Sequence, residues 1–452
     1  MTNTPLSNRR HVTLFGCTNA GKSTIFNAIL GQEAAIVSEM EGTTTDPVVK
    51  AMELVPFGPI VLVDTAGFED ATPLSQKRIK KTLHMMDKTD VGIVVADEAV
   101  YRDEKLPCDH VSIKGKDIRI ERLIHELDLR EIPYMLVLNR KNGNHARALS
   151  HDGDDVSEAD GVNEAGNANG AGGANKAGGV NKADGAGESA DIVTFIKDDP
   201  GSLENIKNKL GKLLEKEEAK SEKKFAGTFI GDLLPKRSAV FLVAPIDGEA
   251  PKGRLILPQV QIIRDCLDHG YTAIVFRDSE LSEALSKYPR PDLVITDSQV
   301  FGYVSSIVPR EIKLTSFSML FARQKGNLEG FLNAEKTLKD LKPGDHVLIA
   351  EACTHSTGHD DIGSVKIPKM LKQKTGGELN IDFCLGQDFP EDLSKYKLII
   401  HCGGCMITQK AMMNRQNRSK NFNVPMINYG ILLASFNGIL ERCCEIFEKK
   451  ES

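Results

Sequence analysis

The sequence GCTNAGKS, at residues 16–23, decides the fold of the first part of the chain. It matches the pattern G-x-x-x-x-G-K-[ST], whose glycines let backbone N–H groups surround a phosphate while the next helix adds the partial positive charge of its N-terminus. An apolar stretch at residues 11–16 predicts a buried strand, and residues 23–31 predict a helix that ends at a glycine. Strand, loop and helix stand in the order that this pattern requires, which predicts a P-loop nucleotide site.

The side chains of this loop define its expected contacts with a nucleotide and its metal ion. Lys22 is placed to reach the β- and γ-phosphates, and the Ser23 hydroxyl is placed to bind Mg²⁺. A base-recognition segment, LVLNRKN, follows at residues 136–142. We expect GTP to contact the following residues of the two segments: Gly16, Asn19, Ala20, Gly21, Lys22, Ser23, Thr24, Asn139, Lys141 and Asn142.

Two further segments occur in the order found in G proteins. GTTTD, at residues 42–46, predicts a switch with a hydroxyl for Mg²⁺; we choose the second threonine, Thr44, and its two neighbours are alternatives. DTAG, at residues 64–67, follows the apolar strand IVLV. Its Asp64 is expected to hold Mg²⁺ through water, and its Gly67 N–H to contact the γ-phosphate. The predicted catalytic residues are Lys22, Thr44, Asp64 and Gly67.

The residue after this second segment bears on the rate of hydrolysis. Phe68 follows Gly67 where Ras-type enzymes carry a glutamine that orients the attacking water, so we expect slow intrinsic hydrolysis. The motifs resemble those of the GTPases that include Era and MnmE, which also have a hydrophobic residue at this position. That resemblance implies that Asn19 helps to bind a K⁺ ion that stimulates hydrolysis. The alternative is that Asn19 caps or tolerates a turn.

The base-recognition segment departs from the usual N-K-x-D. It reads Asn139, Arg140, Lys141 and Asn142, so an amide stands where a carboxylate accepts two hydrogen bonds from guanine. Two interpretations remain open. Either Asn142 occupies the site and selectivity is relaxed toward xanthine nucleotides, or the insertion that follows displaces the loop and another acid serves. A clear S-A-K element for the last guanine contact is absent near residues 194–198.

The size and composition of the chain limit its class. At 452 residues it is too long for one ordinary core, so several domains are expected. A hydrophobic share of 40%, a charged share of 27% and a net charge of −6 fit a soluble globular protein and argue against a nucleic-acid or acidic-membrane binder. The sequence has no run of about 18 apolar residues and no segment like a signal peptide at its amino terminus. We therefore expect a cytoplasmic protein with no nucleic acid and no membrane as a partner.

The order of expected strands and helices predicts an α/β fold in three domains. Residues 1–217 are a P-loop GTPase domain with a parallel sheet, in which residues 143–190, rich in Gly, Ala and Asn, are a disordered insertion. After a linker at residues 218–237, residues 238–321 carry no ligand motif and are expected to form a small α/β dimerisation domain. The cysteine motifs lie in residues 322–452. Expected strands include residues 60–63, 91–95, 134–138, 191–196, 272–276, 292–296 and 313–317, with others beginning SAVFLV, HVLIAE and KLIIH, and expected helices include residues 203–214 and 260–270.

The nine cysteines do not indicate a disulfide framework, because their number is odd and the chain is expected to be intracellular. Most are interpreted as ordinary small residues. The exceptions are C-x-H at residues 353–355 and H-C-x-x-C at residues 401–405, each after a predicted strand. Three thiolates suit a [4Fe–4S] cluster with a weaker fourth ligand, and three cysteines with a histidine are also a standard zinc set. His401 has a structural alternative, because neighbouring side chains on a strand point to opposite faces.

The combination of motifs resembles the HydF family of [FeFe]-hydrogenase maturation factors over essentially the whole chain apart from the insertion. The segments GCTNAGKS, GTTTDPV, DTAGF and IIHCGGCM carry this resemblance. It implies that Cys353, Cys402 and Cys405 bind a [4Fe–4S] cluster, that His355 and His401 are the histidines of the motif, and that the chain forms homodimers through its middle domain. It also implies a GTP-binding scaffold that receives a transient diiron subcluster made with the radical-SAM enzymes HydE and HydG and delivers it to apo-[FeFe]-hydrogenase. The fourth cluster ligand stays open.

Two other classes of protein remain as alternatives. One is an RNA-associated GTPase like Era or MnmE with a structural zinc domain, against which the acidic charge balance weighs. The other is a metal-storage or metallochaperone protein with a degenerate nucleotide site. In the preferred interpretation GTP is a switch, because the γ-phosphate orders loops that are released after hydrolysis.

Overall fold

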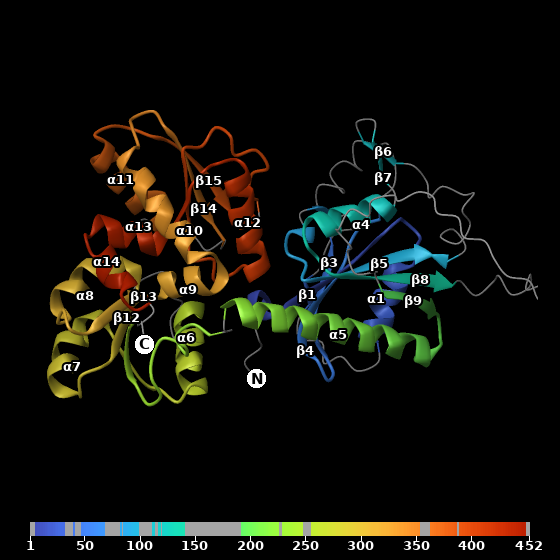
Figure 1. Ribbon diagram of the computed structural model, residues 1–452, viewed down its shortest axis with the longest axis horizontal. Coiled ribbons are helices and arrows are strands. Elements are labelled where there is room, and N and C mark those ends of the chain that lie inside the picture. The colour runs from blue at the N-terminus through green and yellow to red at the C-terminus, as the bar shows by residue number, and fades with distance from the viewer. Residues whose placement is uncertain are drawn as a thin grey trace, which may run out of the picture.

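The computed structural model describes residues 5–31, 39–40, 47–67, 82–83, 85–98, 111–113, 116–118, 120–140, 191–225, 228–246, 255–352, 362–386 and 388–448. These residues form three α/β domains, each built on its own sheet (Figure 1). The first domain, blue to green in Figure 1, lies to one side, and the second and third domains, yellow and red, lie together on the other. The predicted α/β class is confirmed in all three domains.

The first sheet has seven strands in the order β2-β3-β4-β1-β5-β8-β9. β4, β1, β5, β8 and β9 are parallel, as predicted, whereas β3 runs antiparallel to β4 and β2 antiparallel to β3. Residues 55–57 join β3 to β4, and so short a connection makes a hairpin because a parallel pair needs a crossover of a dozen or more residues. The strands are β1 Arg10–Gly16, β2 Glu39–Met40, β3 Val48–Leu54, β4 Gly58–Asp64, β5 Val91–Asp97, β8 Tyr134–Arg140 and β9 Asp191–Ile196; β6 Val111–Ile113 and β7 Lys116–Ile118 form a separate hairpin.

Both faces of the first sheet are buried. Val12 and Leu14 of β1 pack with Ile25 of the first helix, while Phe15 packs on the opposite face with Leu127. This explains the continuous apolar runs of the sequence, since a parallel sheet is covered on both sides. The helices of this domain are α1 Lys22–Leu30, α4 Ile120–Leu129 and α5 Pro200–Phe225. The last extends beyond the expected end at Leu214, so its final turns occupy part of the predicted linker.

The second domain contains a four-stranded parallel sheet in the order β11-β10-β12-β13. Its strands and the helix at residues 257–268 confirm the expected α/β alternation of this segment. The elements are β10 Ala239–Val243, α6 Leu257–Asp268, β11 Thr272–Phe276, α7 Leu281–Lys287, β12 Leu293–Thr296, α8 Phe301–Ile307, β13 Lys313–Ser316 and α9 Phe317–Lys325.

The third domain repeats this strand order, with a parallel sheet β15-β14-β16-β17. Because β15 lies on one side of β14 and β16 on the other, the chain reverses direction across the sheet between β14 and β16, which is where ligands bind in open α/β sheets. The sequence did not predict β15, an edge strand whose side chains are mostly outside the core. The elements are α10 Leu328–Asn333, β14 His346–Glu351, α11 Ile367–Thr375, β15 Asn380–Leu385, β16 Leu398–His401, α12 Gln409–Asn421, β17 Met426–Asn428, α13 Tyr429–Phe436 and α14 Leu440–Cys444.

None of the helices in the described part of the chain is both long and apolar enough to cross a lipid bilayer. The longest, α5, has 26 residues but carries many lysines and glutamates.

Candidate functional site

The predicted P-loop lies between β1 and α1, at the carboxyl edge of the first sheet. Gly16 (φ 147°) and Gly21 (φ 97°) adopt conformations that favour glycine. A Cβ at Gly16 would lie 2.2 Å from the Val95 carbonyl oxygen, and a Cβ at Gly21 would lie 2.0 Å from Asn139 Nδ2. The two glycines of the motif are therefore required by close contacts with β5 and β8 as well as by the loop conformation.

The Lys22 side chain lies inside the loop. It is buried, and its Nζ donates hydrogen bonds to the carbonyl oxygens of Gly16 and Cys17, at 3.1 and 2.8 Å. The ammonium group is thus held at the N-terminus of α1, where the helix also presents unpaired N–H groups. This arrangement places two sources of positive charge at one point, which suits a polyphosphate.

Ser23 and Asp64 form the candidate metal site. The Ser23 hydroxyl donates a hydrogen bond to Asp64 Oδ2 at 2.6 Å, while Asp64 Oδ1 is buried and has no hydrogen-bond partner among the residues that the structure describes. Burial raises the pKa of Asp64, and the hydrogen bond from Ser23 and the charge of Lys22 oppose this shift. A hydroxyl and a carboxylate with an unpartnered oxygen fit Mg²⁺, which takes oxygen ligands and keeps several waters. Thr44, the other predicted ligand, lies outside the described residues.

Gly67 lies against the P-loop. A Cβ at this position would be 2.3 Å from Thr18 Oγ1 and 2.5 Å from Thr18 Cα, so only glycine fits. The preceding Thr65 is buried and its hydroxyl donates to the Leu14 carbonyl oxygen at 2.6 Å, which ties this segment to β1. The structure therefore brings the segment at residues 64–67 onto the phosphate loop.

Asn139 and Arg140 of the base-recognition segment lie within the described residues. Asn139, at the end of β8, is buried, and its Nδ2 donates to the Ala20 carbonyl oxygen at 2.9 Å, which joins this segment to the P-loop. Lys141 and Asn142 lie outside the described residues. Asn19 has a positive φ of 59°, and its predicted contact with K⁺ remains a prediction.

A cavity of about 560 Å³ lies beside α1, with lining residues from Ser23 to Gly31. Thr24 and Asn27 line one wall, and the loop between β9 and α5 lines the other with Lys197 and Asp198. This loop is where the S-A-K element was sought in the sequence. Lys197 and Asp198 were not among the predicted site residues, because this segment does not match the S-A-K motif. The signal that could have found them is the pair of charged side chains directly after β9.

The second candidate site lies where the third sheet reverses direction. Cys402 follows β16, and its Sγ accepts hydrogen bonds from the backbone N–H groups of Ala352 and Gly404, at 3.1 and 3.4 Å. Ala352 follows β14 and precedes Cys353 in the chain, so the neighbouring residue of the first motif is in contact with the second motif. Burial raises the pKa of the Cys402 thiol to about 11, while the two N–H groups lower it. A bound cation stabilises the thiolate that such a site disfavours.

His401 ends β16 and is fully buried. Arg415 Nη1 donates to His401 Nε2 at 2.8 Å, so the ring proton is on Nδ1, which donates to the Cys402 carbonyl oxygen at 2.8 Å. Burial and the charge of Arg415 lower the pKa of His401 to about 3. Because both ring nitrogens are hydrogen-bonded, ligation of a metal by His401 requires one of these bonds to break, and the arrangement favours the structural alternative.

Lys325, at the end of α9, is hydrogen-bonded to the backbone of the cysteine loop at residues 404–407. Its buried Nζ donates to the carbonyl oxygens of Gly404, Cys405 and Ile407, at 3.2, 3.1 and 2.6 Å. Burial lowers its pKa to about 8, and the thiols of Cys405 and Cys402 oppose this shift. The helix α9, which follows the sheet of the second domain, therefore supplies a cation to the loop that carries the thiols.

The structure does not assemble a complete set of metal ligands within the part of the chain that it describes. Cys353 and His355 lie outside those residues, and among the remaining side chains no group of three or more His, Cys, Asp or Glu could hold a metal ion. What the described residues show is two thiols on one loop, with Ala352, the residue before the first motif, in contact with Cys402. This donor set fits a thiolate-bound metal centre.

The fold and the two sites define a P-loop GTPase domain followed by two parallel α/β domains, the last with a thiol site. Family models match each part: residues 11–140 match "50S ribosome-binding GTPase", residues 229–326 match "Hydrogen maturase F dimerization domain" and residues 329–446 match "Hydrogen maturase F tetramerization domain". The chain therefore belongs to the hydrogen maturase F (HydF) family of hydrogenase-maturation GTPases.

Relatives with curated descriptions are similar over part of the chain. The tRNA modification GTPase MnmE of Ehrlichia chaffeensis is 33% identical over 138 residues, which are 28% of this chain and 31% of that protein. MnmE of Thermus thermophilus is 40% identical over 90 residues, 20% of each protein. The chain thus spans less than a third of the length of these relatives.

Two solved structures of Era are also similar. Era of Aquifex aeolicus aligns with 66% of this chain and 97% of its own, at 14% identity and a TM-score of 0.27. Era in complex with MgGDPNP and a fragment of 16S ribosomal RNA aligns with 30% of this chain and 42% of its own, at 23% identity and a TM-score of 0.23.

Proposed function

We propose that this chain binds and hydrolyses GTP with Mg²⁺, and that it is a scaffold for the diiron subcluster of [FeFe]-hydrogenase. The observation that supports the scaffold role is the contact between Cys402 Sγ and the N–H of Ala352, the residue that precedes the first cysteine motif in the chain. A GTPase domain in the same chain supplies the switch. The HydF domain models support this combination.

Different residues of the first domain are proposed to contact the phosphates, the Mg²⁺ ion and the base of GTP. Lys22 and the N-terminus of α1 bind the phosphates, Ser23, Asp64 and Thr44 hold Mg²⁺, and the Gly67 N–H contacts the γ-phosphate. Mg²⁺ neutralises charge between the β- and γ-phosphates. No glutamine follows Gly67, so we propose slow hydrolysis that a K⁺ ion at Asn19 stimulates. Gly16, Ala20, Gly21 and Thr24 complete the phosphate contacts, and Asn139, Lys141 and Asn142 surround the base.

The third domain is proposed to hold a [4Fe–4S] cluster through Cys353, Cys402 and Cys405. A cluster with three thiolate ligands has one iron that is held more weakly or exchanges its ligand. His355 and His401 are the histidines of the motif. Because both ring nitrogens of His401 are hydrogen-bonded, we propose that His401 orients the cysteine loop and is not the fourth ligand of the cluster. The diiron subcluster is cargo, which we propose is received through HydE and HydG and passed to apo-hydrogenase.

The second and third domains are proposed to assemble the chain into homo-oligomers. The dimerization and tetramerization models match residues 229–326 and 329–446, which supports assembly beyond the homodimer predicted from the sequence. We keep the predicted boundaries, 1–217 for the GTPase domain, 238–321 and 322–452, as proposals. The cytoplasm is the proposed compartment, because the cysteines of the described residues are free thiols.

Anaerobic reconstitution with iron and sulfide tests the proposed cluster. The unmodified protein should bind about four irons and give the EPR signal of a reduced cluster. Cys402→Ser and Cys405→Ser should each lose most of the iron, whereas the matched control Cys444→Ser, a partly exposed cysteine elsewhere in the domain, should not. A colourless protein with one tightly held zinc would overturn the scaffold and favour a structural metal site.

A further inference from the structure

Helix α12 packs directly on the cysteine loop. A Cβ at Gly404 (φ 68°) would lie 2.4 Å from Met412 Cε, so the helix and the loop are in close contact. One turn further, Arg415 is buried and its Nη1 donates to His401 Nε2 at 2.8 Å. Its Nη2 donates to the Gly386 carbonyl oxygen at 2.7 Å, and its guanidinium lies 5.1 Å from the centre of the Phe389 ring. The inner face of α12 therefore fixes the orientation of the histidine that begins the H-C-x-x-C motif.

The outer face of the same helix contacts the GTPase domain. Asn414 Nδ2 donates to the Asp87 carbonyl oxygen at 2.7 Å, and Arg418 Nη2 pairs with Asp87 Oδ2 at 2.9 Å. Lys410 Nζ donates to the carbonyl oxygen of Arg130 at 3.1 Å, at the end of α4. Three side chains of α12, spread over two turns, thus reach two segments of the first domain.

These contacts fall on a segment that is tied to the nucleotide site. Asp87 opens the connection into β5, in which the Thr89 hydroxyl donates to Thr13 Oγ1 of β1 at 2.8 Å. Asp90 N–H donates to the His11 carbonyl oxygen at 2.8 Å, and His11 N–H donates to Asp90 Oδ2 at 2.7 Å. β1 leads directly into the P-loop. The segment at residues 87–90, which α12 contacts, is therefore hydrogen-bonded to the strand that positions the phosphate loop.

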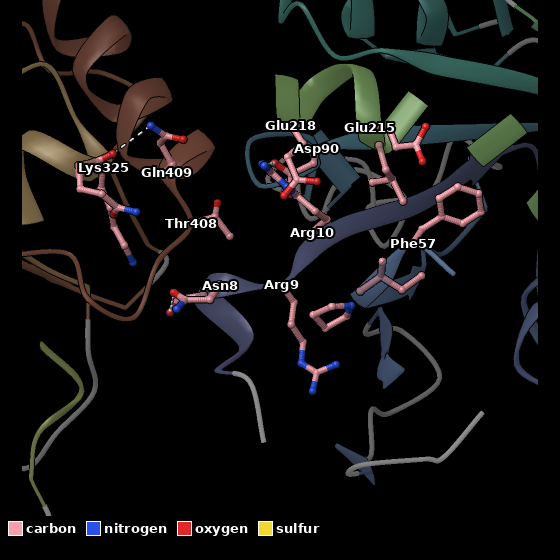
Figure 2. Close-up of a pocket in the computed structure, with 15 residues that line it drawn as sticks. Asn8, Arg9, Arg10, Phe57, Asp90, Glu215, Glu218, Lys325, Thr408 and Gln409 are labelled. Carbon is pink, nitrogen blue, oxygen red and sulfur yellow. Dashed lines mark hydrogen bonds and ion pairs between the residues drawn. The ribbon is translucent and has the colours of Figure 1, made fainter. Parts of the chain in front are cut away.

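A cavity beside this junction separates the domains. It has a volume of about 360 Å³, and Figure 2 shows Lys325, Thr408 and Gln409 on one side facing Arg10 and Asp90 of the GTPase domain on the other. The start of α12 lies in the wall of the cavity, and Asn414 and Arg418 bridge to the first domain further along the helix. The start of α12 therefore lies next to an open space between the two domains.

We propose that α12 links the nucleotide state of the GTPase domain to the cysteine loop, with Arg415 as the residue that positions His401 and Cys402. The inference rests on the proposed function, since it requires both GTP and a metal centre. A shift of the Asp87 segment on exchange of GDP for GTP moves Asn414 and Arg418, and the rigid helix carries this movement to Arg415, three residues from Arg418 and one from Asn414. Such couplings need two arrangements with different contacts, and interfaces of this kind are bistable rather than continuously deformable.

Hydrogen–deuterium exchange on the full chain tests the link with a readout other than activity. Protein with a reconstituted cluster is compared in complex with GDP and with a non-hydrolysable GTP analogue, in peptides that cover residues 401–421. Allosteric coupling typically amounts to about 5- to 150-fold, so we expect exchange in these peptides to differ at least about 5-fold between the two nucleotides. By reciprocity, loading of the cluster changes the affinity ratio for the two nucleotides by the same factor by which the nucleotides change the affinity for the cluster.

Two double variants on the same helix separate the junction from general effects on α12. Asn414→Ala with Arg418→Gln removes the contacts to Asp87 and should abolish the nucleotide difference in exchange, with GTP affinity and iron content retained. The matched control is Asn417→Ala with Lys420→Gln, two exposed side chains of α12, and it should retain the full difference. An equal nucleotide response in the junction variant and the control would overturn the inference and leave the proposed function intact.

Arg415 is tested by the EPR spectrum of the reduced cluster. In the unmodified protein the g-values should change when GDP is replaced by the GTP analogue. Arg415→Met removes the donors and should lose this response, and Arg415→Lys, which keeps one donor, should retain part of it. If the Met variant does not fold, the junction variant decides the question in the same spectrum. An unmodified protein that binds neither nucleotide nor cluster would overturn the proposed function and this inference together.

Discussion

The Ser23 hydroxyl donates a hydrogen bond to Asp64 Oδ2 at 2.6 Å, although Ser23 lies at the start of α1 and Asp64 ends β4. The other oxygen of Asp64 is buried and has no hydrogen-bond partner within the described part of the chain. A buried carboxylate oxygen without a hydrogen bond is costly, unless a ligand supplies the missing contact. The pair is therefore arranged for a hydrated cation that approaches from the phosphate side.

Removal of either member of this pair should weaken binding of MgGTP. Hydrogen bonds to charged groups contribute about 1.5–3 kcal/mol, so Ser23→Ala and Asp64→Asn should each raise the Kd of MgGTP about 10- to 100-fold. The loss should disappear when Mg²⁺ is chelated, because the phosphates are held by Lys22 and the helix N-terminus. Isothermal titration with and without EDTA measures both values. Ser286→Ala, an exposed serine on α7, is the control, and an equal loss without Mg²⁺ would assign Ser23 to the phosphates instead.

Gly67→Ala should disable the nucleotide site. The new Cβ would lie 2.5 Å from Thr18 Cα and 2.7 Å from Thr18 N, which are backbone atoms that move only if the P-loop moves. We expect GTP affinity to fall more than about 10-fold, since a misplaced loop loses several phosphate contacts. Gly201→Ala in the first turn of α5 is the matched control, because a Cβ there meets only Asp199 Oδ1 at 3.4 Å. Equal GTP affinity in the two variants would show that the loop accommodates the methyl group.

Asn142 should set the base preference if it occupies the acidic position of N-K-x-D. Asn142→Asp should then raise the preference for GTP over XTP, because a carboxylate accepts two hydrogen bonds from guanine and repels the acceptor of xanthine. Competition binding with GTP, XTP and ATP measures the ratio, and Asn142→Ala shows whether the side chain matters at all. A GTP preference that is unchanged in both variants would remove Asn142 from the site, and Asp198 in the cavity beside α1 is the next acid to test.

Lys88 should destabilise the junction between the first and third domains at neutral pH. Burial and the charge of Arg415 lower its pKa from 10.5 to about 8, while Asp87 and Asp388 oppose the shift. The unfolded chain therefore binds the proton more tightly than the folded chain, and stability rises as the pH increases from about 8 toward 10.5. Lys88→Gln should raise the Tm near neutral pH, and the gap to the unmodified protein should narrow in alkaline buffer. A gap that does not change with pH would rule out the ammonium charge as its cause.

The nucleotide site could be read from the sequence because its motifs fix the backbone. Gly16, Gly21 and Gly67 are each required by a contact of less than 2.5 Å to a hypothetical Cβ, so these glycines encode the packing of the P-loop on β5, on β8 and on the segment at residues 64–67. The strands that end at the cysteine motifs were predictable for a related reason. Both are short apolar runs, and both belong to the buried centre of a parallel sheet.

The cations around the cysteine loop were not predictable in this way. Lys325 ends α9, a helix that follows the sheet of the second domain, and its role depends on three carbonyl groups about eighty residues later in the chain. Arg415 lies three residues after the buried Met412, so helical spacing places it on the buried face of α12, but nothing in the sequence gives its partner His401. Such contacts depend on how domains pack, which local patterns do not specify.

The 26 residues of α5 have a mechanical consequence. At 1.5 Å per residue the helix is about 39 Å long, and a tilt of about ten degrees at one end displaces the other by about 7 Å. Its first residue, Pro200, lines the cavity beside α1, and its far end leads toward α6 of the second domain (Figure 1). A displacement of this size at the far end is more than twice the 2.7 to 2.9 Å length of the hydrogen bonds that Asn414 and Arg418 make with Asp87.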